Sequence, residues 1–251
     1  MSEYQSTAYP VSEEVLSKAF NAVMARVYLW MTLGLVVTTA VSVWVFNTPA
    51  VYNFIFSNFF VIIGLFVLQI VMVVALVKAL QTISTGAALT MFFVYAGLMG
   101  LTLSSILFYY TSGTITLAFG VAAIVFVLMS VIGIVTKQDL TKWGPILFFG
   151  LIGIIVATVV NMFLRSSMLD LIISYLGVAL FMGLIVYDTK YIKDMTAKAV
   201  VSNNGMTSGS AITTSGEGSV ALSKLSVLGA LKLYLDFINL FLFLLRIFGR
   251  R

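Results

Sequence analysis

The sequence predicts an all-α membrane protein, a polytopic bundle of seven transmembrane helices. Of its 251 residues, 61% are hydrophobic and only 9% are charged, whereas about 25% of the residues of a soluble protein are charged. The mean hydropathy is +1.11. The apolar residues also occur in long runs of about 20, the length of helix that crosses a hydrocarbon core about 30 Å thick. So few charges cannot cover a surface in water, so the chain must be solvated by lipid.

Polar and Gly- or Pro-containing breaks separate seven such runs. The predicted spans are Val27–Phe46, Phe54–Val77, Ala87–Tyr110, Thr114–Val135, Pro145–Leu164, Leu169–Tyr187 and Val227–Phe248. Helices are favoured over barrel strands because the runs are long and evenly apolar, and because backbone groups in lipid must be satisfied within the segment.

Two further segments complete the predicted domain organisation. Residues 1–26 form a cytoplasmic tail ahead of the transmembrane domain, residues 27–251, and they lack the apolar core of a cleavable signal peptide. Residues 199–223 are rich in Ser, Thr, Gly and Asn. This composition is typical of a flexible linker, here on the cytoplasmic side between the sixth and seventh spans, or of an inserted spacer without a function of its own.

The basic residues predict the orientation, because Lys and Arg accumulate in cytoplasmic loops. Those assigned to the cytoplasmic side are Lys18, Arg26, Lys78, Lys137, Lys142, Lys190, Lys193, Lys198 and Lys224. Seven crossings then place the N-terminus in the cytoplasm and the C-terminus in the periplasm. Arg246, Arg250 and Arg251 oppose this assignment. Full crossing of the last helix is preferred, and a last helix that re-enters and leaves on the same side stays open.

The composition excludes several kinds of chemistry. The chain has no cysteine and no histidine, so disulfides, Cys/His metal sites and Ser-His-Asp or Cys-His catalysis are impossible. We therefore expect no enzyme activity and no cofactor. The net charge of +5 comes from residues at the ends of apolar runs. This placement indicates contact with membrane lipid rather than with nucleic acid.

Small residues recur every four positions in two of the predicted spans. Ala96, Gly100 and Ser104 form one stripe, and Gly153, Ala157 and Asn161 form the other. Such stripes let helices pack closely in a bilayer. A pore-facing or ligand-facing stripe is the alternative.

Two carboxylates are predicted to lie within the membrane. Asp188 is at the cytoplasmic end of the sixth span, on a face with Phe181 and Gly177, and Asp236 lies a few turns into the seventh. Lys232, Asp236, Asn239 and Phe243 share a helical face. A carboxylate at this depth costs at least about 2.5–3.5 kcal/mol unless it is paired or hydrated, so a functional role is the default interpretation.

Because one helix runs inward and the next begins at the same side, both aspartates fall in the inner half of the bilayer. If adjacent, they would share a proton, and Ca²⁺, which prefers carboxylate oxygens, would replace it. Asp188 and Asp236 thus form a predicted two-carboxylate site for a proton or a Ca²⁺ ion. Lys78 is a candidate counter-ion to this site, and Asn239 a candidate supporting residue. In the simpler alternative, Asp188 pairs with Lys190 and Asp236 only hydrogen-bonds across helices.

Four segments resemble a known family. MGLIVYDTKYI (residues 182–192) and ALKLYLDFINLFL (residues 230–242) resemble the two hallmark segments of the Bax inhibitor-1 (TMBIM) family. GLMGLTLSS (residues 97–105) and TKQDLTKWG (residues 136–144) resemble its bacterial branch. The resemblance runs from about Met24 to the C-terminus, in register with the seven spans.

The resemblance implies a seven-helix fold with a central last helix, a pH-sensitive calcium leak, a stress or cytoprotective role and a bacterial inner-membrane location. It implies that Asp188 and Asp236 form the pH sensor. Two departures stand out. The gating cation of the family is an arginine in the second helix, where this chain offers Lys78, and lysine lacks the planar fork that grips two carboxylates. The linker before the last helix is also longer than is usual in the family.

Four functions are compatible with these observations. The first is a proton-regulated, calcium-permeable leak channel. The second is a contact regulator of a membrane protease or another membrane protein, which should tolerate Asp236→Asn, whereas a cation path should not. The third is an exchanger that couples protons to Ca²⁺ or Na⁺. The fourth is an aspartate-only membrane hydrolase, although the usual Gly-x-Gly-Asp setting is missing. The lack of a phosphate-binding P-loop argues against ATP-driven pumping.

Overall fold

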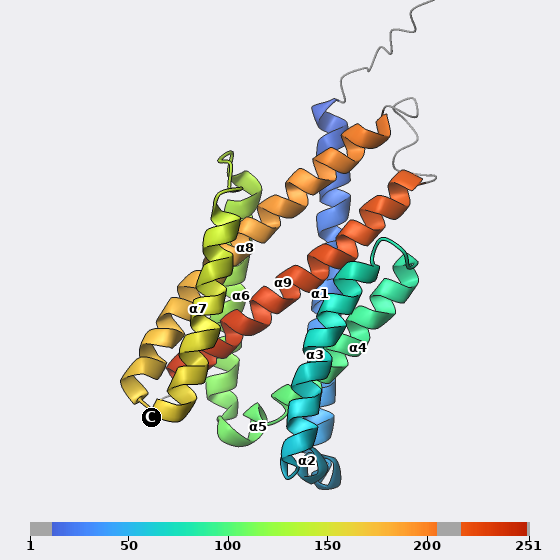
Figure 1. Ribbon diagram of the computed structural model, residues 1–251. Coiled ribbons are helices and arrows are strands. Elements are labelled where there is room, and N and C mark those ends of the chain that lie inside the picture. The colour runs from blue at the N-terminus through green and yellow to red at the C-terminus, as the bar shows by residue number, and fades with distance from the viewer. Residues whose placement is uncertain (1–11, 205–216, 250–251) are drawn as a thin grey trace, which may run out of the picture.

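The computed structural model describes residues 12–204 and 217–249, and this part of the chain is a bundle of nine helices without a strand (Figure 1). The helices are α1 (Glu13–Phe46), α2 (Pro49–Phe56), α3 (Phe59–Ala79), α4 (Thr85–Leu103), α5 (Ile106–Tyr109), α6 (Ser112–Val135), α7 (Trp143–Leu164), α8 (Ser167–Asn204) and α9 (Glu217–Phe248).

The predicted all-α bundle with seven spans is confirmed. Within the described residues, seven helical segments are long and apolar enough to cross a membrane. The third of them, Thr85–Tyr109, combines α4 with the short α5. Helix α2 is an additional short helix, with Pro49 in its first turn, in the loop between the first two spans. Proline suits this position because the first helical residues have no intrahelical partner for their N–H groups.

Three helices extend beyond the predicted spans at one end of the bundle. Helix α1 begins at Glu13, where the Ser12 side chain accepts a hydrogen bond from the Val15 N–H and caps the helix. Most of the predicted tail is therefore helical, and residues 1–11 lie outside the described residues.

The ends of the predicted linker are helical as well. Helix α8 continues through Asn204 and α9 begins at Glu217. Only residues 205–216, which lie outside the described residues, separate the two helices. The reason is packing: Val200 of α8 and Leu222 of α9 are buried in the common core, and burial of an apolar face overrides the weak helix propensity of Ser, Thr and Asn.

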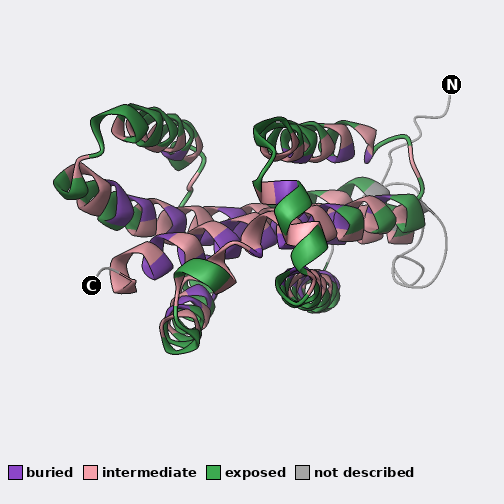
Figure 2. Ribbon diagram, turned by 90° about the horizontal axis from the view of Figure 1, so that it is seen from below, coloured by how far each residue is buried: buried purple, intermediate pink, exposed green. Residues whose placement is uncertain are grey.

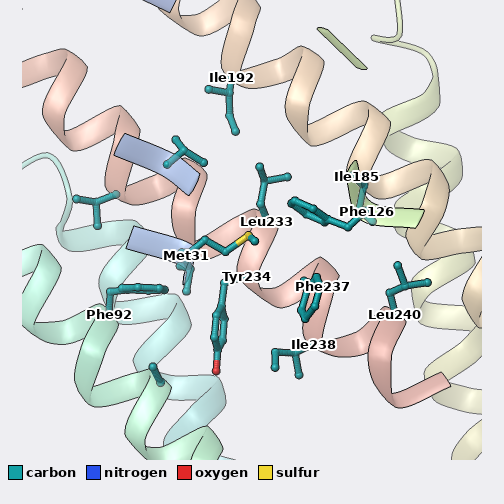
Figure 3. Packing of buried hydrophobic residues seen from close by; sticks show 14 of the residues in the cluster. Met31, Phe92, Phe126, Ile185, Ile192, Leu233, Tyr234, Phe237, Ile238 and Leu240 are labelled. Carbon is teal, nitrogen blue, oxygen red and sulfur yellow. The ribbon is translucent and has the colours of Figure 1, made fainter. Parts of the chain in front are cut away.

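Helix α9 occupies the centre of the bundle. In its apolar window 72% of the residues are buried, whereas no other span exceeds 28%. It crosses obliquely between its neighbours in Figure 1, and Figure 2 shows the exposed outer faces of the surrounding helices. Figure 3 shows how its rings pack on different sides: Tyr234 lies edge-on to Phe92 of α4 (centroids 5.5 Å apart), and Phe237 lies edge-on to Phe126 of α6 (5.6 Å).

The two small-residue stripes have different environments. The stripe of α4 is buried against α1, where Ser42 donates a hydrogen bond of 2.9 Å to the Gly100 carbonyl and Thr38 donates one of 2.9 Å to the Ala96 carbonyl. The packing interpretation of this stripe is confirmed.

The stripe of α7 mediates helix packing only in part: Ala157 packs against the common core, whereas Gly153 is exposed. A Cβ atom added at Gly153 would meet nothing within 4 Å. Helix α7 is the least buried span, and lipid offers no hydrophobic penalty to an exposed apolar face. The polar member, Asn161, instead serves the helix end. Its side-chain oxygen accepts the Ser166 N–H (3.0 Å), next to Arg165 with its left-handed φ of 51°.

The two ends of the bundle differ in charge. We call the end where α1 begins the basic end, because Lys18, Lys78, Lys142, Lys198 and Lys224 all lie there, at the beginnings or ends of helices. Helix α9 starts at this end and continues unbroken to the opposite one. There the Arg246 guanidinium pairs with the Asp170 carboxylate near the start of α8 (3.4 Å) and lies over the Phe243 ring (5.5 Å).

Full crossing by the last helix therefore agrees with the structure, and a re-entrant last helix does not. The Arg246 charge that opposes the orientation rule is matched by an aspartate at the same depth. Arg250 and Arg251 lie outside the described residues.

Candidate functional site

The structure brings the two predicted aspartates together. Asp188 of α8 and Asp236 of α9 are 6% and 5% exposed, and their carboxyl groups lie within hydrogen-bonding reach of each other. Two carboxyl groups this close in a low-dielectric interior favour a shared proton or a bound cation, because two bare charges would repel strongly.

The local packing of α8 against α9 explains this placement. The helices run antiparallel, and the face of α8 that carries Asp188 meets the face of α9 that carries Asp236. Towards the opposite end, the Phe243 ring fills the space beside Gly177, where an added Cβ would lie 2.7 Å from ring atoms. The Phe181 and Phe243 rings are 5.8 Å apart. We call this contact between the two helices the α8–α9 seam. Along it, the Asp188–Asp236 pair is followed by the rings of Phe181 and Phe243 and then by the Asp170–Arg246 ion pair.

Lys232 completes the site, although its position in the sequence predicted no role for it. Its ammonium donates a hydrogen bond of 2.7 Å to Asp188 Oδ1 and lies 5.0 Å from the centre of the Tyr191 ring. The Lys232 side chain is 33% exposed, whereas that of Asp188 is 8% exposed. The signal was available, since Lys232 precedes Asp236 by one helical turn on the same face of α9. What the sequence did not show is how far that face turns towards α8.

One oxygen of the pair is left without a donor. Among the described residues, Asp236 Oδ2 is the buried side-chain oxygen that has no hydrogen-bond partner. An unsatisfied buried oxygen is costly, and in native proteins it calls for a specific explanation. A proton or a cation held between the two carboxyl groups would supply it.

Within the described residues, three other side chains considered for the site form no hydrogen bond or ion pair with either aspartate. Lys78 is exposed in the last turn of α3, and within the described residues it forms no ion pair with either aspartate. Asn239 donates its side-chain hydrogen bond to the Leu235 carbonyl on its own helix (2.8 Å). Lys190 pairs with Asp194 (2.8 Å) rather than with Asp188, so the simpler alternative for Asp188 is wrong.

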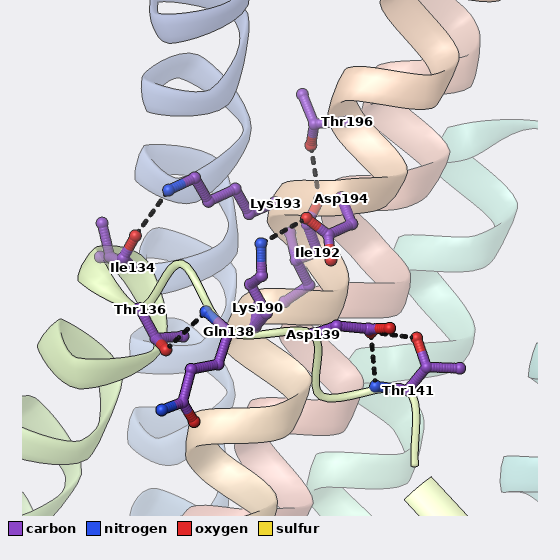
Figure 4. A network of polar contacts seen from close by, with 10 residues as sticks. All are labelled: Ile134, Thr136, Gln138, Asp139, Thr141, Lys190, Ile192, Lys193, Asp194 and Thr196. Carbon is purple, nitrogen blue, oxygen red and sulfur yellow. Dashed lines mark hydrogen bonds and ion pairs between the residues drawn. The ribbon is translucent and has the colours of Figure 1, made fainter. Parts of the chain in front are cut away.

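Polar groups nearer the basic end are engaged among themselves (Figure 4). Lys193 donates to the Ile134 carbonyl in the last turn of α6 (2.6 Å). Asp139, in the loop between α6 and α7, accepts hydrogen bonds from the Thr141 hydroxyl (2.5 Å) and N–H (2.9 Å). These bonds, the hydroxyl one first, hold the pKa of Asp139 below its usual range. Neither Asp139 nor Asp194 therefore adds a carboxylate to the pair.

The site offers few ligands to a metal ion. Across residues 12–204 and 217–249, no three Asp, Glu, His or Cys side chains gather closely enough to hold one. Two carboxylates can bind a hard cation such as Ca²⁺ only if backbone oxygens or water complete the six to eight ligands that Ca²⁺ takes. The pair thus suits transient rather than tight binding of an ion.

The fold and the site together define a class: a seven-span helical membrane protein whose central helix contributes one half of a buried carboxyl pair. Comparison with known proteins shows the family. Residues 20–251 match the family model described as "Inhibitor of apoptosis-promoting Bax1", and the chain belongs to this Bax inhibitor-1 family.

Bacterial relatives match over nearly their full length. The chain is 42% identical over 245 residues to the inner membrane protein YbhL of Escherichia coli K12, which covers 97% of this chain and 98% of the relative. It is 39% identical over 239 residues to an uncharacterized protein of Borreliella burgdorferi, covering 95% of each. It is 38% identical over 228 residues to one of Deinococcus radiodurans, covering 91% and 90%. The predicted resemblance to the family and its bacterial branch is confirmed.

Proposed function

We propose that this protein is a pH-sensitive, calcium-permeable leak channel of the bacterial inner membrane, gated by Asp188 and Asp236. The observation that carries the proposal is the buried carboxyl pair between α8 and α9, with one oxygen of Asp236 lacking a donor. A carboxylate within a bilayer is expensive, so its presence there supports a role in an ion or proton path.

The mechanism follows from the groups that face the pair. These are Lys232 from α9 and, beyond it, Tyr191 from α8. When the two aspartates share a proton and Asp188 pairs with Lys232, the α8–α9 seam carries no uncompensated charge and stays closed. When the proton leaves, the carboxylates repel each other and attract a cation, and the seam opens for its passage.

The testing experiment is Ca²⁺ flux into proteoliposomes that hold the purified full chain, between pH 6 and pH 8. Flux should rise with pH in the wild type, because deprotonation frees the carboxylates. Asp188→Asn and Asp236→Asn should each remove that pH dependence and lower the flux at pH 8 by at least about tenfold, since an amide neither titrates nor attracts a cation.

Asp194→Asn is the matched control, because Asp194 is exposed and pairs with Lys190 away from the site. It should leave flux and pH profile unchanged. No flux above that of empty liposomes at any pH would refute the leak and leave a contact regulator. Flux that requires a counter-gradient of protons or Na⁺ would identify an exchanger instead.

We further propose that the basic end faces the cytoplasm. The lysines that gather at that end support this orientation, because Lys and Arg accumulate in cytoplasmic loops. The name of a relative that aligns over nearly its whole length, an inner membrane protein, supports the choice of membrane.

Single-cysteine labelling tests the orientation directly, because the chain has no cysteine of its own. Gln138→Cys, exposed in the loop between α6 and α7, should react with a membrane-impermeant maleimide only after the cytoplasmic side is opened. Ser57→Cys, exposed between α2 and α3, should react in intact spheroplasts. The reverse pattern would invert the topology.

A further inference from the structure

The ammonium of Lys232 is a positive charge already resident in the acidic site. It comes from the same helix as Asp236 but bonds Asp188 across the seam at 2.7 Å. It therefore occupies one side of the position that a cation bound to both carboxylates would take. Lys78, the cation implied by the family resemblance, makes no such contact in the described part of the chain.

A charge count shows what this lysine does to the site. Two ionised carboxylates carry two negative charges, and the ammonium cancels one of them. Tyr191 faces the ammonium with a neutral ring, and the neighbouring lysines are engaged elsewhere: Lys190 with Asp194, and Lys193 with the Ile134 carbonyl. One positive charge therefore restores neutrality, and the buried, unpartnered Asp236 Oδ2 marks where it belongs.

We propose that Lys232 sets the cation preference of the site: with its ammonium on Asp188, the site accepts one proton or one monovalent cation, and a divalent cation binds only after the ammonium leaves. This role of Lys232 refines the proposed channel function. Only the flux measurement below rests on that function, since the measurement of Ca²⁺ affinity does not require a conducting protein. A bound Ca²⁺ with the ammonium in place would leave one excess positive charge in a low-dielectric interior, which is unfavourable.

The structure also contains an alternative position for the Lys232 ammonium, over the Tyr191 ring. The Lys232 side chain is one-third exposed and already lies over the Tyr191 ring, which can stabilise a cation through its π face. A small rotation of the lysine towards this ring would vacate Asp188 without moving either helix. Lys232 is thus a positioning residue that acts through Asp188.

The experiment compares wild type, Lys232→Gln and the control Lys198→Gln, an exposed lysine on the same helix as Asp188. Each full-length protein is assayed at pH 8 for the ratio of Ca²⁺ to Na⁺ permeability in proteoliposomes, and for Ca²⁺ affinity in detergent by calorimetric titration. Lys232→Gln should raise both the ratio and the affinity at least about tenfold, because the site then carries two uncompensated charges. Lys198→Gln should match the wild type.

Lys232→Arg keeps the ion pair and serves if the glutamine variant does not fold. Arginine can hold Asp188 through two parallel hydrogen bonds, so it should lower the permeability ratio below that of the wild type. An arginine ratio above the wild-type value would overturn the inference.

The outcomes separate this inference from the channel proposal. If the wild type conducts Ca²⁺ but Lys232→Gln changes neither the ratio nor the affinity, the role of Lys232 is refuted and the channel stands. If the wild type carries no flux but Lys232→Gln binds Ca²⁺ more tightly, the channel is refuted and the role of Lys232 stands.

Discussion

Lys232→Met should lower the free energy of unfolding by about 3 kcal/mol, and a second change, Asp188→Asn, should restore most of that loss. Removing one partner of a buried ion pair costs about 3–5 kcal/mol, because the other charge stays buried and unpaired. The lower end applies here, since the Lys232 side chain is one-third exposed whereas that of Asp188 is 8% exposed. Removing both charges leaves no such penalty.

The measurement is reversible unfolding in mixed detergent micelles, for the wild type, both single variants and the double variant. The cycle of four proteins isolates the Lys232–Asp188 interaction from other effects of each change. Lys198→Met is the control for the loss of a lysine at the basic end, and it should be nearly neutral. A Lys232→Met protein as stable as the wild type would show that the pair contributes nothing to the folded state.

Gly100→Val should be at least as destabilising, at about 3 kcal/mol, with a fall in melting temperature of roughly 6–12 °C. A Cβ at this position would lie 2.6 Å from the Thr38 backbone oxygen and 2.8 Å from the Val41 Cβ. Both atoms are fixed by the backbone of α1 and cannot move by a side-chain rotation, so α4 must move away from α1. The hydrogen bonds from Thr38 to the Ala96 carbonyl and from Ser42 to the Gly100 carbonyl would then stretch.

Gly153→Val is the matched control, because it makes the same exchange in a small-residue stripe of the same spacing. An added Cβ at Gly153 meets nothing within 4 Å, so the variant should melt within about 2 °C of the wild type, or slightly higher because glycine weakens a helix. The two proteins are compared by thermal unfolding in the same detergent. Equal melting temperatures would mean that the close α1–α4 contact is not needed for stability.

The seven spans could be predicted because the length of an apolar run reports directly on membrane crossing. The role of each span could not. Helix α7 and helix α9 are both apolar, yet one faces lipid and the other fills the core. Lipid and protein interior are equally apolar solvents, so hydropathy does not distinguish Gly153, which is exposed, from Gly100, which is buried. The ends of α8 and α9 were missed because distant packing, at Val200 and Leu222, decides them.

The same limit explains what was predicted at the site. Asp188 and Asp236 could be found because an acid in an apolar run is rare and costly, whatever surrounds it. The partner of Asp188 depends on how α8 and α9 rotate against each other, which the sequence of either helix does not specify. Lys190, two residues away in the chain, points to Asp194, whereas Lys232, far along the chain, reaches Asp188.

The central position of α9 has a consequence for how the protein is made. The ribosome synthesises α9 after α1 to α8, so the helix that fills the centre of the bundle is inserted last. Until then Asp188 lacks the lysine that pairs with it, and the surfaces of α1, α4, α6 and α8 that α9 covers lack their packing partner. Arrival of α9 supplies the missing ammonium and the missing core in a single step. A nascent chain halted before Glu217 would therefore lack both Lys232, the partner of Asp188, and the helix that fills the core.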